Sequence, residues 1–106
     1  MTTSYKGRRD KGIRGEREVM TALQQAGFEV RGLEGRGDHL ASKKGEHGPV
    51  ILHVEVKRQE TLRIDAWSEQ AETEAPSVAT PLVAYRRSGQ PWRVSLRLDD
   101  LLKFIR

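Results

Sequence analysis

The chain has 106 residues, and its 19 lysines and arginines exceed its 15 aspartates and glutamates, which gives a formal net charge of +4. This length fits a single domain, residues 1–106, and the absence of cysteine excludes a disulfide scaffold, a cysteine zinc site and a thiol nucleophile. No apolar run approaches the roughly 20 residues that a membrane helix needs.

The excess of basic residues indicates an anionic partner, with nucleic acid as the first choice. Only 36% of the residues are hydrophobic, so we expect a small core, and domains of this kind often gain stability as homodimers. The N-terminal segment is basic but lacks the apolar region of a secretory signal. We therefore expect an intracellular, cytoplasmic protein.

The N-terminal third of the chain predicts a basic arm followed by a helix. Residues 1–10 contain Lys6, Arg8 and Arg9 and little that could be buried, so we expect a flexible arm there. From Lys11 onward the apolar residues recur at helical spacing, and Gly27 suits the C-terminal cap of such a helix.

The rest of the chain alternates between strand and helix signals. Residues 50–57 (VILHVEVK) are apolar on both faces in their first half, which is typical of a central strand. Pro76 ends a second helix, and Asp99 can cap a last short one. The other expected elements are strands at residues 28–33, 38–42, 80–85 and 92–96, turns at residues 34–37 and 43–49, and the second helix at residues 64–75. This order predicts a mixed α/β domain.

Glu16 breaks the pattern of the first helix. At about 100° per residue it falls between Ile13 and Met20, in the middle of the apolar stripe. A carboxylate directed at a core is costly unless something compensates it, so Glu16 either pairs with an arginine or serves a functional site. Glu18 lies on the polar side of the helix, where we expect solvent.

The end of the central strand carries a second anomaly. Glu55 and Lys57 share one face, roughly 6.6 Å apart along the strand, and Asp38 begins the preceding strand after a glycine-rich turn. Two carboxylates from adjacent strands form an oxygen site for a hard divalent cation. A lysine beside that site can orient the attacking water and offset phosphate charge. Taken alone, the acid and the lysine also suit an ordinary ion pair.

The pattern Asp38…Glu55-Val56-Lys57 resembles the signature of the PD-(D/E)XK nucleases, although Gly37 stands where the family name has proline. Residues 11–18 (KGIRGERE) resemble the first helix of the archaeal-type Holliday junction resolvases. The layout is also similar to that of small phage-encoded nucleases. The resemblance covers roughly residues 11–85. It implies the restriction-endonuclease-like fold, with an αβββαβ core, a mixed sheet flanked by helices, and an added C-terminal strand and short helix.

The resemblance also implies roles for individual residues. Asp38 and Glu55 would bind Mg²⁺, with Mn²⁺ able to substitute, and the backbone carbonyl of Val56 would reach the same ion. Lys57 would orient the hydrolytic water, and Glu16 would hold a water near the metal or a second metal. A glutamine on the second helix matches one often found in the family and would support the lysine or the water; in this chain it is Gln70.

By the same resemblance the protein would be an endonuclease acting on branched or duplex DNA as a two-fold dimer, structure-selective or only weakly specific. Sequence-independent contacts to backbone phosphates would come from Arg8, Arg9, Lys11, Arg14 and Arg36. His53 shares the face of Glu55 and could border the site, but we expect it to be a buried histidine with a hydrogen-bond partner. We expect Trp67 and Trp92 to be core residues.

Two other functions stay open. A non-catalytic DNA-binding module with the same fold would explain the basic charge equally well. A structural protein could instead use Glu16, Asp38, Glu55 and Lys57 as a buried ion network. Metal titration and the salt dependence of DNA binding separate these alternatives from a nuclease.

Overall fold

A computed structural model describes residues 5–33 and 38–105, and it describes the side chains of residues 11–32 and 38–105. The element order is the predicted one, a helix, three strands, a helix, two strands and a helix. In chain order the elements are α1 (Tyr5–Gln25), β1 (Glu29–Leu33), β2 (Asp38–Gly45), β3 (Gly48–Arg58), α2 (Ile64–Glu74), β4 (Thr80–Arg86), β5 (Arg93–Ser95) and α3 (Leu98–Ile105).

The strands form one mixed sheet in the order β1-β2-β3-β4-β5. The pairs β1–β2, β2–β3 and β4–β5 are antiparallel, whereas β3 and β4 are parallel and are connected through α2. α2 ends at Glu74 because Ala75, which precedes Pro76, adopts an extended conformation. In the strand order given above, β3 lies at the centre of the sheet, as its apolar sequence predicts.

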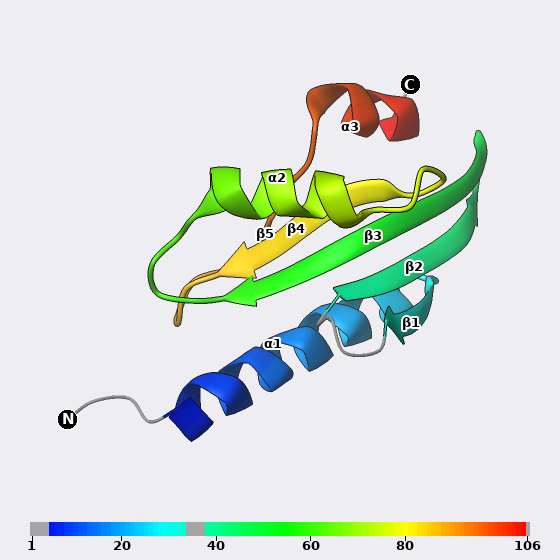
Figure 1. Cartoon of the computed structure of the whole chain (residues 1–106). Helices are drawn as coiled ribbons and strands as arrows, with labels where there is room; N and C mark the ends of the chain where they lie inside the picture. The colour runs from blue at the N-terminus through cyan, green and yellow to red at the C-terminus, as the bar shows by residue number, and fades with distance from the viewer. Residues whose placement is uncertain (1–4, 34–37, 106) are drawn as a thin grey trace.

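Helices cover both faces of this sheet, with α1 on one side and α2 and α3 on the other (Figure 1). Alternation along β3 directs Leu52 and Val54 toward α1, where they pack with Val19 in the larger core cluster. The smaller cluster lies under α2 and is built from Trp67, Ala71 and Val83. The intervening residues of β3, His53 and Glu55, consequently face α2.

Two regions differ from the sequence prediction by more than one residue. α1 begins at Tyr5, so residues 5–10, which we expected to be part of a flexible arm, are helical; lysine and arginine are good helix formers and need no burial. The turn expected at residues 43–49 is a two-residue hairpin turn between Gly45 and Gly48, where Gly48 has a φ of 113°. The hairpin strands are correspondingly longer, and residues 1–4 and 34–37 lie outside the described residues.

α1 is fixed to the sheet by a residue that we expected to be solvated. The Glu18 carboxylate accepts hydrogen bonds from Trp92 Nε1 at 2.8 Å, Arg86 Nη1 at 3.1 Å and Arg58 Nη1 at 3.4 Å. Arg86 also lies over the Trp92 ring, 5.7 Å from its centroid. One helix carboxylate thus connects α1 to β3, β4 and the segment before β5.

The molecule is elongated, with extents of 50 × 26 × 26 Å. Figure 1 shows why: the N-terminal turns of α1 run past the carboxyl ends of β3 and β4. Within the described residues, no helix combines the length and apolar character needed to cross a lipid bilayer.

Candidate metal centre

The β2–β3 register brings two carboxylates face to face. Asp38, the first residue of β2, is directly opposite Glu55 on β3, and both are buried, with 0% and 3% of their surface exposed. His53 lies on the same face of β3 and is completely buried. One ligand atom from each of Asp38, His53 and Glu55 lies within 4.8 Å of the others.

His53 is hydrogen-bonded to Asp38. Its Nε2 atom is 2.5 Å from Asp38 Oδ2, and neither side chain is exposed to solvent. This agrees with the reading of His53 as a buried histidine with a partner. The partner, however, is one of the two predicted metal ligands.

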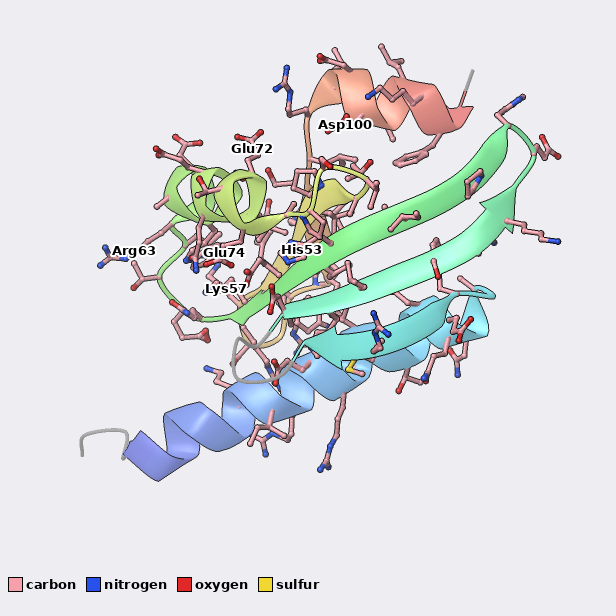
Figure 2. All side chains as sticks on the ribbon, turned by 45° about the vertical axis from the view of Figure 1, so that its right-hand side comes forward. His53, Lys57, Arg63, Glu72, Glu74 and Asp100 are labelled. Atoms are coloured by element: carbon pink, nitrogen blue, oxygen red, sulfur yellow. The ribbon has the colours of Figure 1, made fainter. Side chains whose placement is uncertain are left out.

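Glu55 is held in an environment that favours its protonated form. Burial raises the pKa of Glu55 from 4.5 to about 7, helped by a hydrogen bond with the Glu74 carboxyl and by repulsion from Glu74 and Asp38. The positive charge of Lys57 lowers this pKa and offsets part of the effect. In Figure 2, His53, Lys57 and Glu74 lie between α2 and the end of β3.

Glu74 belongs to this cluster, although it was not among the site residues predicted from the sequence. It follows Trp67 and Ala71 on the buried face of α2, at helical spacings of four and three residues. The same argument that singled out Glu16 on α1, an acid within an apolar stripe, applies to Glu74 on α2. The sequence therefore contained a signal for this residue.

Gln70 contacts Glu74 rather than a residue of β3 in the described hydrogen bonds. Its Nε2 atom donates to Glu74 Oε1 at 3.0 Å, and Glu74 in turn bonds to Glu55. The side chain is otherwise exposed on α2. The role that the resemblance implies for Gln70, support of Lys57 or of the water, stays a prediction.

Glu16 lies against the other face of the sheet. Its Oε1 atom is 3.5 Å from His39 Nε2, and its side chain is 27% exposed. His39 follows Asp38 on β2, so it faces α1 whereas Asp38 faces α2. Glu16 is thus directed at the sheet, as its place in the apolar stripe predicts, but it is not part of the Asp38, His53 and Glu55 group.

A groove opens beside the candidate centre. It has a volume of about 540 Å³ and is bordered by Lys11, Gly12 and residues 56–61 at the end of β3. Lys11 also forms an ion pair with Glu60 at 3.5 Å. Among the other predicted phosphate contacts Arg14 is exposed on α1, and the side chains of Arg8, Arg9 and Arg36 lie outside the described ones.

The residues of the centre fit a divalent cation. Asp38 and Glu55 provide the carboxylate oxygens that Mg²⁺ and Mn²⁺ prefer. Glu55 Oε1 is buried and has no hydrogen-bond partner among the described residues, so this oxygen is available to bind a cation. Val56, whose carbonyl was predicted as a further ligand, follows Glu55 on β3, and its side chain packs on the α1 side.

The comparison with known proteins identifies a similar solved structure. No protein-family model and no curated protein matches the sequence. The structure is similar to that of Hjc from Archaeoglobus fulgidus, a Holliday junction resolvase from an archaeal hyperthermophile, with a TM-score of 0.61 and 30% identity over 81% of this chain and 72% of that chain. This match confirms the predicted restriction-endonuclease-like fold. The chain therefore belongs to the PD-(D/E)XK nuclease superfamily, among the archaeal-type Holliday junction resolvases.

Proposed function

We propose that this protein is a divalent-metal-dependent DNA endonuclease that hydrolyses phosphodiester bonds in branched DNA, such as a four-way junction, or in duplex DNA with weak specificity. The observation that carries the proposal is the pairing of Asp38 with Glu55 across β2 and β3, with Lys57 on the same face. The resolvase family of the chain supports the same reaction class.

Asp38 and Glu55 would hold the cation, with the Val56 carbonyl as a further ligand. When bound, Mg²⁺ or Mn²⁺ would supply Lewis-acid chemistry toward the phosphate. Lys57 would orient the water whose oxygen attacks phosphorus, and its ammonium would offset the charge that develops on the phosphate. The bond from phosphorus to one sugar oxygen would then break, the attacking water would release a proton to solvent, and the leaving sugar oxygen would take one up from solvent. Glu16 lies against His39 on the other face of the sheet, so the part that the resemblance gives it, holding a water or a second cation, is the least supported part of this proposal.

The DNA backbone would approach along the groove beside Lys57 and the projecting turns of α1. Lys11 borders this groove, and Arg14 is exposed on the same helix. The full set of proposed phosphate contacts is Arg8, Arg9, Lys11, Arg14 and Arg36. Because two strands of a junction must be cut, we propose that the enzyme works as a two-fold homodimer inside the cell.

The proposal is tested by cleavage of four-way junction, flap, duplex and single-stranded DNA with Mg²⁺ or Mn²⁺. We expect the wild type to cut at least one branched or duplex substrate and Lys57→Ala to cut none, while its melting temperature and DNA affinity stay close to wild type. Lys44→Ala, an exposed lysine of the β2–β3 hairpin, is the matched control and should cut normally. Full activity of Lys57→Ala would contradict the proposed role of this lysine.

The non-catalytic DNA-binding module predicts a different result in the same assay. Such a module would bind DNA with a strong salt dependence but would cut nothing with either metal, and Asp38→Asn would leave its Mn²⁺ binding unchanged. We favour the nuclease because Asp38, Glu55 and Lys57 are all present. The two acids are also buried together, an arrangement that DNA binding alone does not need.

A further inference from the structure

We propose that His53 is a positioning residue for the metal centre: its Nε2–H donates to Asp38 Oδ2 and fixes the orientation of that carboxylate opposite Glu55. The inference rests on the proposed metal-dependent function and adds a residue to it. The sequence indicates a buried histidine that could border the site, and the resemblance to known nucleases gives it no role.

The contact is diagonal across two strands. His53 is directly opposite Leu40, whereas Asp38 is opposite Glu55, so the imidazole reaches back across the β2–β3 ladder to the start of β2. Diagonal neighbours are about 7–8 Å apart, a distance that an imidazole and a carboxylate together can span. Because both side chains are fully buried, the hydrogen bond leaves the Asp38 carboxylate little freedom to rotate.

The same geometry argues against Nε2 of His53 as a metal-binding atom. His53 Nδ1 is buried and has no hydrogen-bond partner among the described residues. A proton placed on Nδ1 would therefore be an unsatisfied buried donor, whereas a proton on Nε2 is accepted by Asp38. With its proton on Nε2, the imidazole has no lone pair there for a cation. His53 is thus suited to holding a ligand.

The first experiment measures Mn²⁺ affinity by titration, with the signal of free Mn²⁺ in electron paramagnetic resonance as the readout. His53→Leu removes the donor at similar volume, and we expect it to weaken binding by about 10- to 100-fold. His53→Gln carries an N–H at a similar reach and should recover most of the loss. His47→Leu, at the exposed hairpin turn, is the control and should bind as the wild type does. Wild-type affinity in His53→Leu would overturn the inference.

The second experiment separates positioning from ligation in the wild-type protein. Electron spin-echo envelope modulation of bound Mn²⁺ detects a directly coordinated imidazole nitrogen, and we expect that coupling to be absent. Its presence would make His53 a ligand and overturn the proposal. Long-range ¹H–¹⁵N NMR of the metal-free protein reports the tautomer without any variant, so the test remains decisive if His53→Leu does not fold. A proton on Nδ1 with none on Nε2 would also refute the proposal.

None of these measurements uses DNA, so the two proposals can fail separately. Loss of Mn²⁺ affinity in His53→Leu together with no cleavage by the wild type would retain the positioning role and refute the nuclease. Cleavage by the wild type with unchanged Mn²⁺ affinity in His53→Leu would support the nuclease and refute the positioning role.

Discussion

At the scale of single residues, Glu55 has a predictable energetic cost. The folded state retains a proton on Glu55 up to about pH 7, whereas the unfolded chain releases it near pH 4.5. Between these values the folded state binds more protons, so the free energy of unfolding must fall as the pH rises from about 4.5 to about 7. The difference in pKa corresponds to at most roughly 3 kcal/mol. Burial of this acid therefore opposes folding at neutral pH.

Replacing the acid by a neutral amide should remove this cost. We expect Glu55→Gln in metal-free buffer to raise the free energy of unfolding at about pH 8 by up to roughly 3 kcal/mol and to change it little at about pH 5. Urea denaturation at the two pH values measures the difference. Glu46→Gln, at the exposed hairpin turn, is the control and should show no such pH dependence. An equal effect of Glu55→Gln at both pH values would rule out the raised pKa.

At the scale of elements, two glycines of α1 experience different surroundings. A Cβ atom at Gly12 would have no neighbour within 4 Å, whereas one at Gly15 would lie 3.1 Å from Arg58 Cβ and 3.3 Å from Trp92 Cη2. Arg58 Cβ is fixed by the central strand and cannot move away. Of Gly12 and Gly15, it is therefore Gly15 at which α1 approaches the sheet more tightly.

We expect the two glycines to respond oppositely to substitution. Gly12→Ala should raise the free energy of unfolding by about 0.5–1 kcal/mol, because alanine favours the helix and meets nothing. Gly15→Ala should give no such gain, and Gly15→Val should lower stability by about 2 kcal/mol through overpacking. Thermal or urea denaturation of the three variants gives the comparison. A gain for Gly15→Ala equal to that of Gly12→Ala would show that α1 does not pack closely at this glycine.

Glu18 holds α1 against β3, β4 and the segment before β5. Its carboxylate is 39% exposed, so solvent screens its ion pairs. Most of its contribution to stability therefore comes from the hydrogen bond that Trp92 Nε1 donates. We expect Glu18→Ala to cost about 1–2 kcal/mol of unfolding free energy, and Glu18→Gln to cost less because it keeps an acceptor. Glu69→Ala, on the exposed face of α2, serves as the reference for removing a helix carboxylate. Equal values for Glu18→Ala and Glu69→Ala would contradict the anchoring role.

Much of the fold and part of the site could be predicted because they follow from local patterns. Gly27 and Pro76 mark where the first two helices end, and a change in apolar period separates helix from strand. The pairing of Asp38 with Glu55 follows once the hairpin turn is placed, because the register of an antiparallel pair is fixed by its turn. Glu74 could equally have been predicted from the sequence, since it continues the apolar stripe of Trp67.

The remainder depends on tertiary contacts that no local pattern contains. The apolar stripe of α1 shows that Glu16 meets the sheet but does not say which face, and the α1 face carries His39 rather than Asp38. Glu18 is polar in a polar position, and only the folded chain brings Trp92 to it. Likewise, α1 starts earlier than its apolar residues suggest, because a helix can extend beyond the region that packs.

At the scale of the whole molecule, α3 leaves an apolar surface uncovered. Four aliphatic side chains on one stripe of this helix remain exposed, and they are Leu98 at 67%, Leu101 at 39%, Leu102 at 46% and Ile105 at 66%. Exposed apolar stripes of this kind mark interaction sites. Because Leu98 and Ile105 lie at the two ends of the stripe, an antiparallel second copy would place its Ile105 against Leu98.

This surface is where we expect the proposed homodimer to form. Four partly exposed side chains bury less surface area than the roughly 800 Å² per partner of a standard interface. The dimer should therefore be weak and its population should depend on concentration. Sedimentation velocity over a wide concentration series should show a monomer–dimer equilibrium in the wild type and only monomer in Leu98→Glu and Ile105→Glu, whose side chains are too exposed to matter for folding. Val78→Glu, 75% exposed outside α3, should still dimerise. A dimer that survives both α3 substitutions would place the two-fold contact on another surface.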